Sequence, residues 1–178
     1  MNVLIRQLHE QDPEVISGAF QDQGWNKPAS LYRTYLEEQR SGQRVPIVAE
    51  VDGCFAGYVN VLWKSNYPSF QEQAIPEIQD FNVLIQYRRQ GIGSRLMDRA
   101  EEIVRERSPV AGIGVGLFSD YGHAQILYAK RGYVPDGRGI HNGSGYVQYG
   151  EQVRIDDDLT LYLTKQLNES SQKGRLST

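Results

Sequence analysis

Cysteine and histidine are scarce in this chain of 178 residues, which holds one cysteine and three histidines. Cys54 has no partner for an internal disulfide, which fits a protein of a reducing compartment. His9, His123 and His141 lie far apart, and no second cysteine stands at a ligand spacing from any of them. A structural zinc site needs such a cluster of ligands, so the sequence predicts a domain without a metal.

Long apolar runs and an excess of positive charge are also lacking. No stretch approaches the roughly 18 apolar residues of a membrane span, and residues 1–8 hold no apolar signal core. We therefore expect a cytoplasmic protein with no membrane partner. Lysine and arginine number 19 against 22 acidic residues, which gives a net charge of −3. Proteins that bind nucleic-acid phosphates are normally basic, so a nucleic-acid partner is not expected.

The apolar pattern predicts one mixed α/β domain over residues 1–166, followed by a polar tail over 167–178. Strands are expected over 3–8, 47–51, 55–63, 77–85, 113–118 and 159–163, with further strand pieces within 132–150. Helices are expected over 13–20, 30–40, 91–107 and 122–131. Asp12 is placed to cap the first helix, Asp52-Gly53 predicts a hairpin turn, and Gly132 is expected to end the last helix.

The segment around residues 81–96 predicts a site for an anion. A strand ends there, Arg88 and Arg89 follow, and Gly91 and Gly93 open an amphipathic helix. Glycine lets the backbone approach a ligand closely, so free N–H groups of the first helical turn can point at phosphate oxygens. The helix dipole and the arginines add positive potential. A surface turn that caps an ordinary helix remains the alternative.

Two other phosphate loops fit this segment poorly. A Walker loop ends in Gly-Lys-Ser/Thr, whereas this one ends in Gly93-Ser94-Arg95. A dinucleotide loop needs a third glycine or an alanine at the position that Leu96 occupies.

Together with a second segment, this loop resembles the GNAT superfamily of acetyl-CoA-dependent N-acyltransferases. Arg88-Arg89-Gln90-Gly91-Ile92-Gly93 is similar to that family's Arg/Gln-x-x-Gly-x-Gly/Ala pyrophosphate loop. About thirty residues on, Ala-Gln-Ile-Leu-Tyr-Ala-Lys-Arg-Gly-Tyr at 124–133 is similar to its Ala-x-x-Leu-Tyr-x-x-x-Gly-Phe/Tyr segment. The resemblance is strong over residues 77–134. It implies a mixed, mostly antiparallel sheet of about seven strands flanked by about four helices.

The resemblance further implies acetyl-CoA as co-substrate and an amine as acceptor. It places the main chain of Val83 and Ile85 against the pantetheine arm, and a backbone N–H near Val83 at the oxyanion. The pyrophosphate would be held by Arg88, Arg89, Gln90, Gly91, Ile92, Gly93 and Ser94. Tyr121 departs from the family pattern, because many relatives have there an asparagine that touches the cofactor.

Acetylation of an amine also needs proton transfer. An alkyl amine with a pKa near 10.4 is mostly protonated at neutral pH, so a base must remove a proton. Glu77 is the candidate base on the strand before the loop, and a solvated residue at a strand start is the alternative. Asp80 shares that strand, but strict alternation predicts that it faces the other side. The resemblance implies that Tyr128 donates a proton to the leaving thiolate; the alternative is an aromatic that completes a helix face.

Three further groups have simpler interpretations. Gly112, Gly114 and Gly116 are expected to permit close packing rather than to bind phosphate. Asp156-Asp157-Asp158 is expected to be a solvated turn. Trp25, Tyr32 and Tyr35 fall where relatives border the acceptor pocket, and core packing is expected of at least two of them.

These features predict an N-acetyltransferase that transfers an acetyl group from acetyl-CoA to a primary amine of a small molecule or protein by direct attack. A module that binds acyl-CoA without turnover is the alternative. An unrelated nucleotide-binding protein is a third class, which the paired motifs disfavour. Homodimerisation is left open, although homodimers are the commonest assembly.

Overall fold

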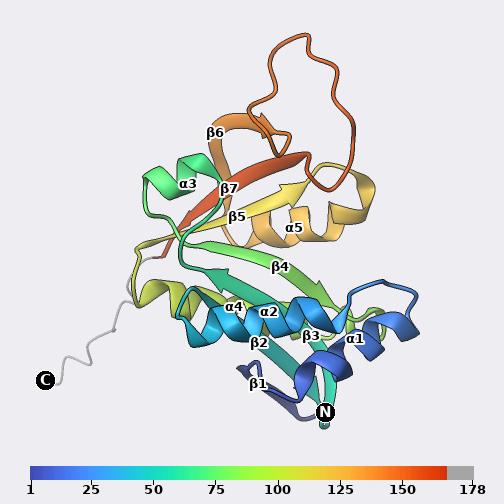
Figure 1. Ribbon diagram of the computed structural model, residues 1–178. Helices are drawn as coiled ribbons and strands as arrows, with labels where there is room; N and C mark the ends of the chain where they lie inside the picture. Colours follow the sequence, from blue (N-terminus) through green and yellow to red (C-terminus); the bar gives the residue numbers. More distant parts are fainter. Residues whose placement is uncertain (168–178) are drawn as a thin grey trace, which may run out of the picture.

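The computed structural model describes residues 1–167, which form one mixed α/β fold of seven strands and five α-helices (Figure 1). The strands are β1 Val3–Gln7, β2 Arg44–Val51, β3 Cys54–Leu62, β4 Glu77–Val83, β5 Val110–Gly116, β6 Val134–His141 and β7 Thr160–Gln166. The helices are α1 Asp12–Asp22, α2 Ala29–Arg40, α3 Pro68–Glu72, α4 Ile92–Arg105 and α5 Gly122–Lys130. The expected fold class is therefore confirmed.

The strands form one sheet in the order β1-β2-β3-β4-β5-β7-β6. Every neighbouring pair is antiparallel except β4 and β5, which run parallel. These two strands pair only at Glu77–Gly112 and Ile78–Ile113, and beyond that point they diverge (Figure 1). The divergence leaves the facing edges of both strands without a strand partner, which opens a cleft in the middle of the sheet.

Helices cover both faces of the sheet. Ile92, Leu96 and Ala100 of α4 pack into a core with β2, β3 and β5, and Tyr128 of α5 joins the same core. On the other face α1 and α2 bury a second cluster, which holds Phe20 among others. The two cores pack against the sheet from both sides, so buried side chains support the cleft on either face.

Most predicted elements are present, and their differences have local causes. Asp12 does not cap α1, because its carboxylate instead accepts the His9 N–H and pairs with Arg6. The short helix α3 falls in a segment that was expected to be a loop. The predicted tail 167–178 lies outside the described residues except for Leu167, which is buried in the central core.

The strand expected over 77–85 ends at Val83, and Ile85 lies in a 3₁₀ turn, Ile85–Tyr87. The register between β3 and β4 shifts at this point: Tyr58 pairs with Asn82 and Asn60 pairs with Gln79. β4 therefore has one more residue between its paired positions than β3 has. Asp80 takes a φ of +46° at this bulge. A bulge reverses the side-chain alternation of the strand beyond it.

Candidate active site

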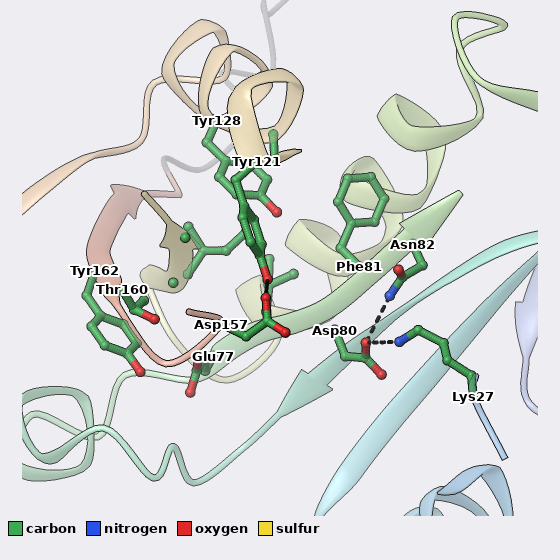
Figure 2. A pocket seen from close by; sticks show the side chains of 15 residues that line it. Lys27, Glu77, Asp80, Phe81, Asn82, Tyr121, Tyr128, Asp157, Thr160 and Tyr162 are labelled. Atoms are coloured by element: carbon green, nitrogen blue, oxygen red, sulfur yellow. Dashed lines mark hydrogen bonds and ion pairs between the residues drawn. The ribbon is translucent and has the colours of Figure 1, made fainter. Parts of the chain in front are cut away.

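A cavity of about 410 Å³ opens where β4 and β5 separate. Its walls come from both strands, from α5, from the segment before α2 and from the loop that precedes β7. The side chains labelled in Figure 2 are Lys27, Glu77, Asp80, Phe81, Asn82, Tyr121, Tyr128, Asp157, Thr160 and Tyr162. The two predicted catalytic residues, Glu77 and Tyr128, both line this cavity.

Glu77 is a buried carboxylate with one occupied oxygen. Its side chain comes from the first residue of β4, and the residue is 7% exposed. The Ser65 hydroxyl donates to Oε2 at 2.6 Å, and no described residue donates to Oε1. Burial raises the pKa of Glu77 above its ordinary value, against the lowering effects of the Ser65 hydrogen bond and the Arg44 charge. A carboxylate with a raised pKa and a free oxygen suits a general base.

Asp80 lines the same cavity, so the prediction that it faces the opposite side is wrong. The β4 bulge is the physical reason, because the extra residue breaks the alternation that the prediction assumed. Lys27 Nζ and Asn82 Nδ2 donate to Oδ1 at 3.0 and 2.9 Å, and Tyr35 and Tyr58 hydroxyls donate to Oδ2 at 2.8 and 2.6 Å. Both oxygens therefore have two donors, and this carboxylate is poorly placed to accept another proton.

Tyr128 is both a core residue and a wall of the cavity. It is 4% exposed and its ring packs against Phe81 and Tyr133, with centroid distances of 6.5 and 6.0 Å. Its hydroxyl makes no hydrogen bond to another described residue. Burial raises the pKa of Tyr128, so its proton is retained at neutral pH and is available for donation.

Tyr121 and Asp157 close the cavity from the side of the last two strands. The Tyr121 hydroxyl donates to Asp157 Oδ1 at 3.1 Å, as Figure 2 shows. Burial and the Asp157 charge raise the pKa of Tyr121 to about 12. Asp157 was expected in a solvated turn, so its place in the cavity wall is a finding of the structure. The turn itself is present, with the Asp158 N–H donating to Asp156.

The glycines of β5 face aromatic side chains, which confirms their expected packing role. A Cβ at Gly112 would lie 2.3 Å from Phe70, and one at Gly116 would lie 2.4 Å from Tyr121. A Cβ at Gly114 would lie 2.9 Å from Thr160. Because Gly114 and Gly116 also line the cavity, the missing side chains widen it.

The predicted anion loop has the geometry of a backbone cradle. Gly91 precedes α4 with a φ of +81°, and Arg89 has a φ of +59°. No side chain caps the helix, and in the described part of the chain the N–H groups of Ile92, Gly93 and Ser94 find no protein acceptor. Three unpaired donors at a helix N-terminus suit a phosphate.

The side chains of the loop stabilise its shape. Arg88 Nε donates to the Val83 carbonyl at 3.2 Å, and its guanidinium lies 5.4 Å from the centre of the Trp25 ring. Gln90 Nε2 donates to the Gln86 carbonyl at 2.8 Å. These contacts hold the turn between β4 and α4 in place before any ligand binds.

Val83 and Ile85 differ in what they can offer a ligand. The Leu84 N–H bonds the Ala56 carbonyl at 2.9 Å. Because bonded and non-bonded pairs alternate in an antiparallel ladder, the N–H of Val83 points away from β3 and toward the cleft. The N–H of Ile85 instead donates to Gln23 Oε1 at 3.0 Å. Contact of Ile85 with a cofactor remains a prediction from the sequence.

Sequence reasoning missed several cavity residues: Lys27, Asn82, Asp157, Thr160 and Tyr162. Lys27, Thr160 and Tyr162 reach the cavity only through the strand order and the path of the connection before α2. No local pattern announces that arrangement. Within residues 1–167 there is no group of three or more His, Cys, Asp or Glu placed to hold a metal ion, and no helix long and apolar enough to cross a bilayer.

The splayed β4–β5 pair thus places a buried carboxylate and a tyrosine in one cleft. The profile of the acetyltransferase (GNAT) family matches residues 5–133, and the chain belongs to this family. The expected family and enzyme class are thereby confirmed. A protein of Archaeoglobus fulgidus named as an uncharacterized N-acetyltransferase is 37% identical over 88 residues, which are 48% of this chain and 56% of that protein. The chain thus spans little more than half the length of that relative.

Solved structures share the whole fold at low sequence identity. The Salmonella typhimurium protein yncA, solved with its cofactor acetyl-CoA, matches 95% of this chain and 96% of its own, with a TM-score of 0.67 and 18% identity. A ribosomal-protein-alanine N-acetyltransferase from Brucella melitensis matches 92% and 99% of the two chains, with a TM-score of 0.67 and 23% identity. A GNAT-family protein of Desulfovibrio desulfuricans gives a TM-score of 0.70 at 13% identity, over 94% and 100% of the two chains.

Proposed function

We propose that this protein transfers an acetyl group from acetyl-CoA to a primary amine by direct attack in a ternary complex. The observation that carries the proposal is the shared cavity of Glu77 and Tyr128 at the point where β4 and β5 separate. A base and a proton donor on opposite walls of one cleft can serve the two ends of an acyl transfer. The Salmonella neighbour that was solved with acetyl-CoA supports the choice of cofactor.

The residues present fit the cofactor. The free N–H groups of Ile92, Gly93 and Ser94 would hold the pyrophosphate, with Arg88 and Arg89 adding positive charge. The open edges of β4 and β5 would take the extended pantetheine arm, with Val83 as one main-chain donor. When bound, acetyl-CoA supplies an acyl group activated as a thioester.

Each catalytic group then has a defined task. Oε1 of Glu77 accepts a proton from the protonated amine, directly or through one water, so that the neutral nitrogen can bond the acyl carbon. The nitrogen then loses its second proton to water. The Val83 N–H donates to the carbonyl oxygen where negative charge develops. As the carbon–sulfur bond breaks, the Tyr128 hydroxyl donates to the sulfur. The acetylated amine and the thiol of coenzyme A are the products.

The acceptor approaches a wall rich in carboxylates. Glu77, Asp80 and Asp157 line the cavity together with Lys27, the sole cation among the lining residues. This balance favours an amine that arrives protonated, which must then lose a proton inside the site. We propose a small molecule or an exposed amine of a protein as the acceptor.

The experiment that tests the proposal measures thiol release from acetyl-CoA by the purified protein across a broad set of amines. Binding of acetyl-CoA is compared with binding of ATP and NAD. Turnover with at least one amine, abolished or strongly reduced in Glu77→Gln, is expected. Binding of acetyl-CoA with no turnover would favour the acyl-CoA-binding module instead. Equal binding of ATP or NAD would favour a general nucleotide-binding protein.

A further inference from the structure

Ser65 is a fully buried residue whose hydroxyl points at the candidate base. It lies between β3 and α3 and is 0% exposed. The Tyr67 N–H donates to Ser65 Oγ at 3.0 Å, and Ser65 Oγ donates to Glu77 Oε2 at 2.6 Å. Because the Tyr67 N–H occupies a lone pair of the oxygen, the hydroxyl hydrogen is left for the carboxylate.

The other charged and titratable groups around Glu77 act on it without a hydrogen bond. Arg44 of β2 pairs with Glu38 and lies 4.3 Å from the centre of the Tyr35 ring, so its guanidinium is engaged elsewhere. Tyr162 of β7 lines the cavity beside Glu77, and Asp80 of β4 is saturated by its own four donors. Among the described residues, Ser65 is therefore the sole hydrogen-bond donor to this carboxylate.

We propose that Ser65 is the positioning residue of the catalytic base: it holds Oε2 of Glu77 so that Oε1 faces the amine, and it keeps the carboxylate ionised. The inference rests on the proposed function, in which Glu77 accepts the proton of the amine. A hydrogen bond to the ionised form of a carboxylate favours that form. Without the hydroxyl, burial would favour the protonated acid, which cannot act as a base.

Ser65→Ala removes this donor and also the acceptor of the Tyr67 N–H. The pKa of the Glu77 carboxyl should rise by about one to two units, which corresponds to one charged hydrogen bond. The acid limb of the kcat–pH profile should move to higher pH by the same amount. Below that limb kcat should fall by about 10–100-fold, and it should recover as the pH rises. The KM for acetyl-CoA should change little, since Ser65 is remote from the anion loop.

Ser69→Ala is the matched control. Ser69 is also buried, at 2% exposed, and lies in α3 close by in the chain. Its hydroxyl accepts from Gln73 Nε2 at 3.0 Å and makes no hydrogen bond to Glu77. Ser65→Cys serves if the alanine variant does not fold, because a thiol is a similar but weaker donor and should produce a smaller shift in the same direction.

The test is a carbon-13 NMR titration of the Glu77 carboxyl in the full chain, with Glu77→Gln to assign the signal, alongside the kcat–pH profiles. An upward shift of the carboxyl pKa in Ser65→Ala or Ser65→Cys, absent in Ser69→Ala, is expected. An unchanged carboxyl pKa, or an equal shift in Ser69→Ala, would overturn the role of Ser65. The titration needs no turnover, so its outcome is separate from a failure of the acetyltransferase assay, which would overturn the proposed function.

Discussion

The Tyr128 hydroxyl should matter for turnover and hardly at all for folding. Its ring is buried against Phe81 and Tyr133, and its oxygen has no hydrogen-bond partner among the described residues. Tyr128→Phe keeps the ring and its packing, and no protein group loses a bond. The free energy of unfolding should therefore change by less than about 1 kcal/mol, the usual contribution of one hydrogen bond.

The effect on turnover follows from the acidity of the two partners. Burial raises the pKa of Tyr128, whereas a free thiol has a pKa of about 8.5. Full proton transfer to the thiolate is therefore uphill, and the larger benefit comes from hydrogen-bond donation as charge develops on sulfur. General acid catalysis contributes about 10²–10⁴-fold, and this mismatch places the expected fall in kcat near 10²–10³-fold. That fall is about 2.7–4.1 kcal/mol of transition-state stabilisation.

Thiol release under saturating acetyl-CoA gives kcat, and thermal unfolding gives stability. Tyr133→Phe is the control, since Tyr133 is equally buried at 4% exposed but does not line the cavity. Its kcat should equal that of the wild type, and the Kd for acetyl-CoA should be similar in both variants. Wild-type kcat in Tyr128→Phe would return this residue to a packing role. Parallel losses in both variants would show that the core, rather than the hydroxyl, is responsible.

Three further substitutions separate the other roles. Glu77→Gln should lower kcat most at low to neutral pH, and kcat should recover as the amine deprotonates at higher pH. Because burial raises the pKa of Glu77, the wild-type kcat should itself fall as the pH drops through that raised value. A pH profile of the variant identical to that of the wild type would place the base elsewhere. Gly91→Val should raise the Kd for acetyl-CoA in a calorimetric titration, whereas Gly53→Val, at a φ of +83° in a distant turn, should cost similar stability with no change in Kd. Asp80→Asn should destabilise the fold by about 1–3 kcal/mol in denaturant unfolding and should leave the acid limb of the kcat–pH profile at the same pH. A shift of that limb would show that Asp80 takes part in removing the proton of the amine.

The sequence predicts the part of the site that is local in the chain. Strand β4, the anion loop and α4 follow one another directly, so their pattern of apolar residues and glycines was sufficient to predict them. Glu77 and Tyr128 could be named because each stands at a fixed offset within a motif that resembles the family. The contact of both with one cavity then depends on the parallel β4–β5 pair.

The remaining part of the site depends on features that no local pattern encodes. Asp80 was placed on the wrong side because a bulge of one residue cannot be read from alternation. Asp157 reaches the cavity because β7 inserts between β5 and β6, so that the loop before β7 lies beside α5. Ser65 lies in a segment without periodicity, and its role becomes visible only through its distance to Glu77.

The β4 bulge gives two carboxylates of one strand different chemistry in the same cavity. Asp80 receives donors from β3, β4, α2 and the segment before α2, so its charge connects four parts of the chain. The lone pairs of such a carboxylate are already used by its donors. Glu77 has a single donor, a buried setting and one free oxygen. The number of donors distinguishes the two residues, and it leaves Glu77 as the group with room for a proton from the substrate.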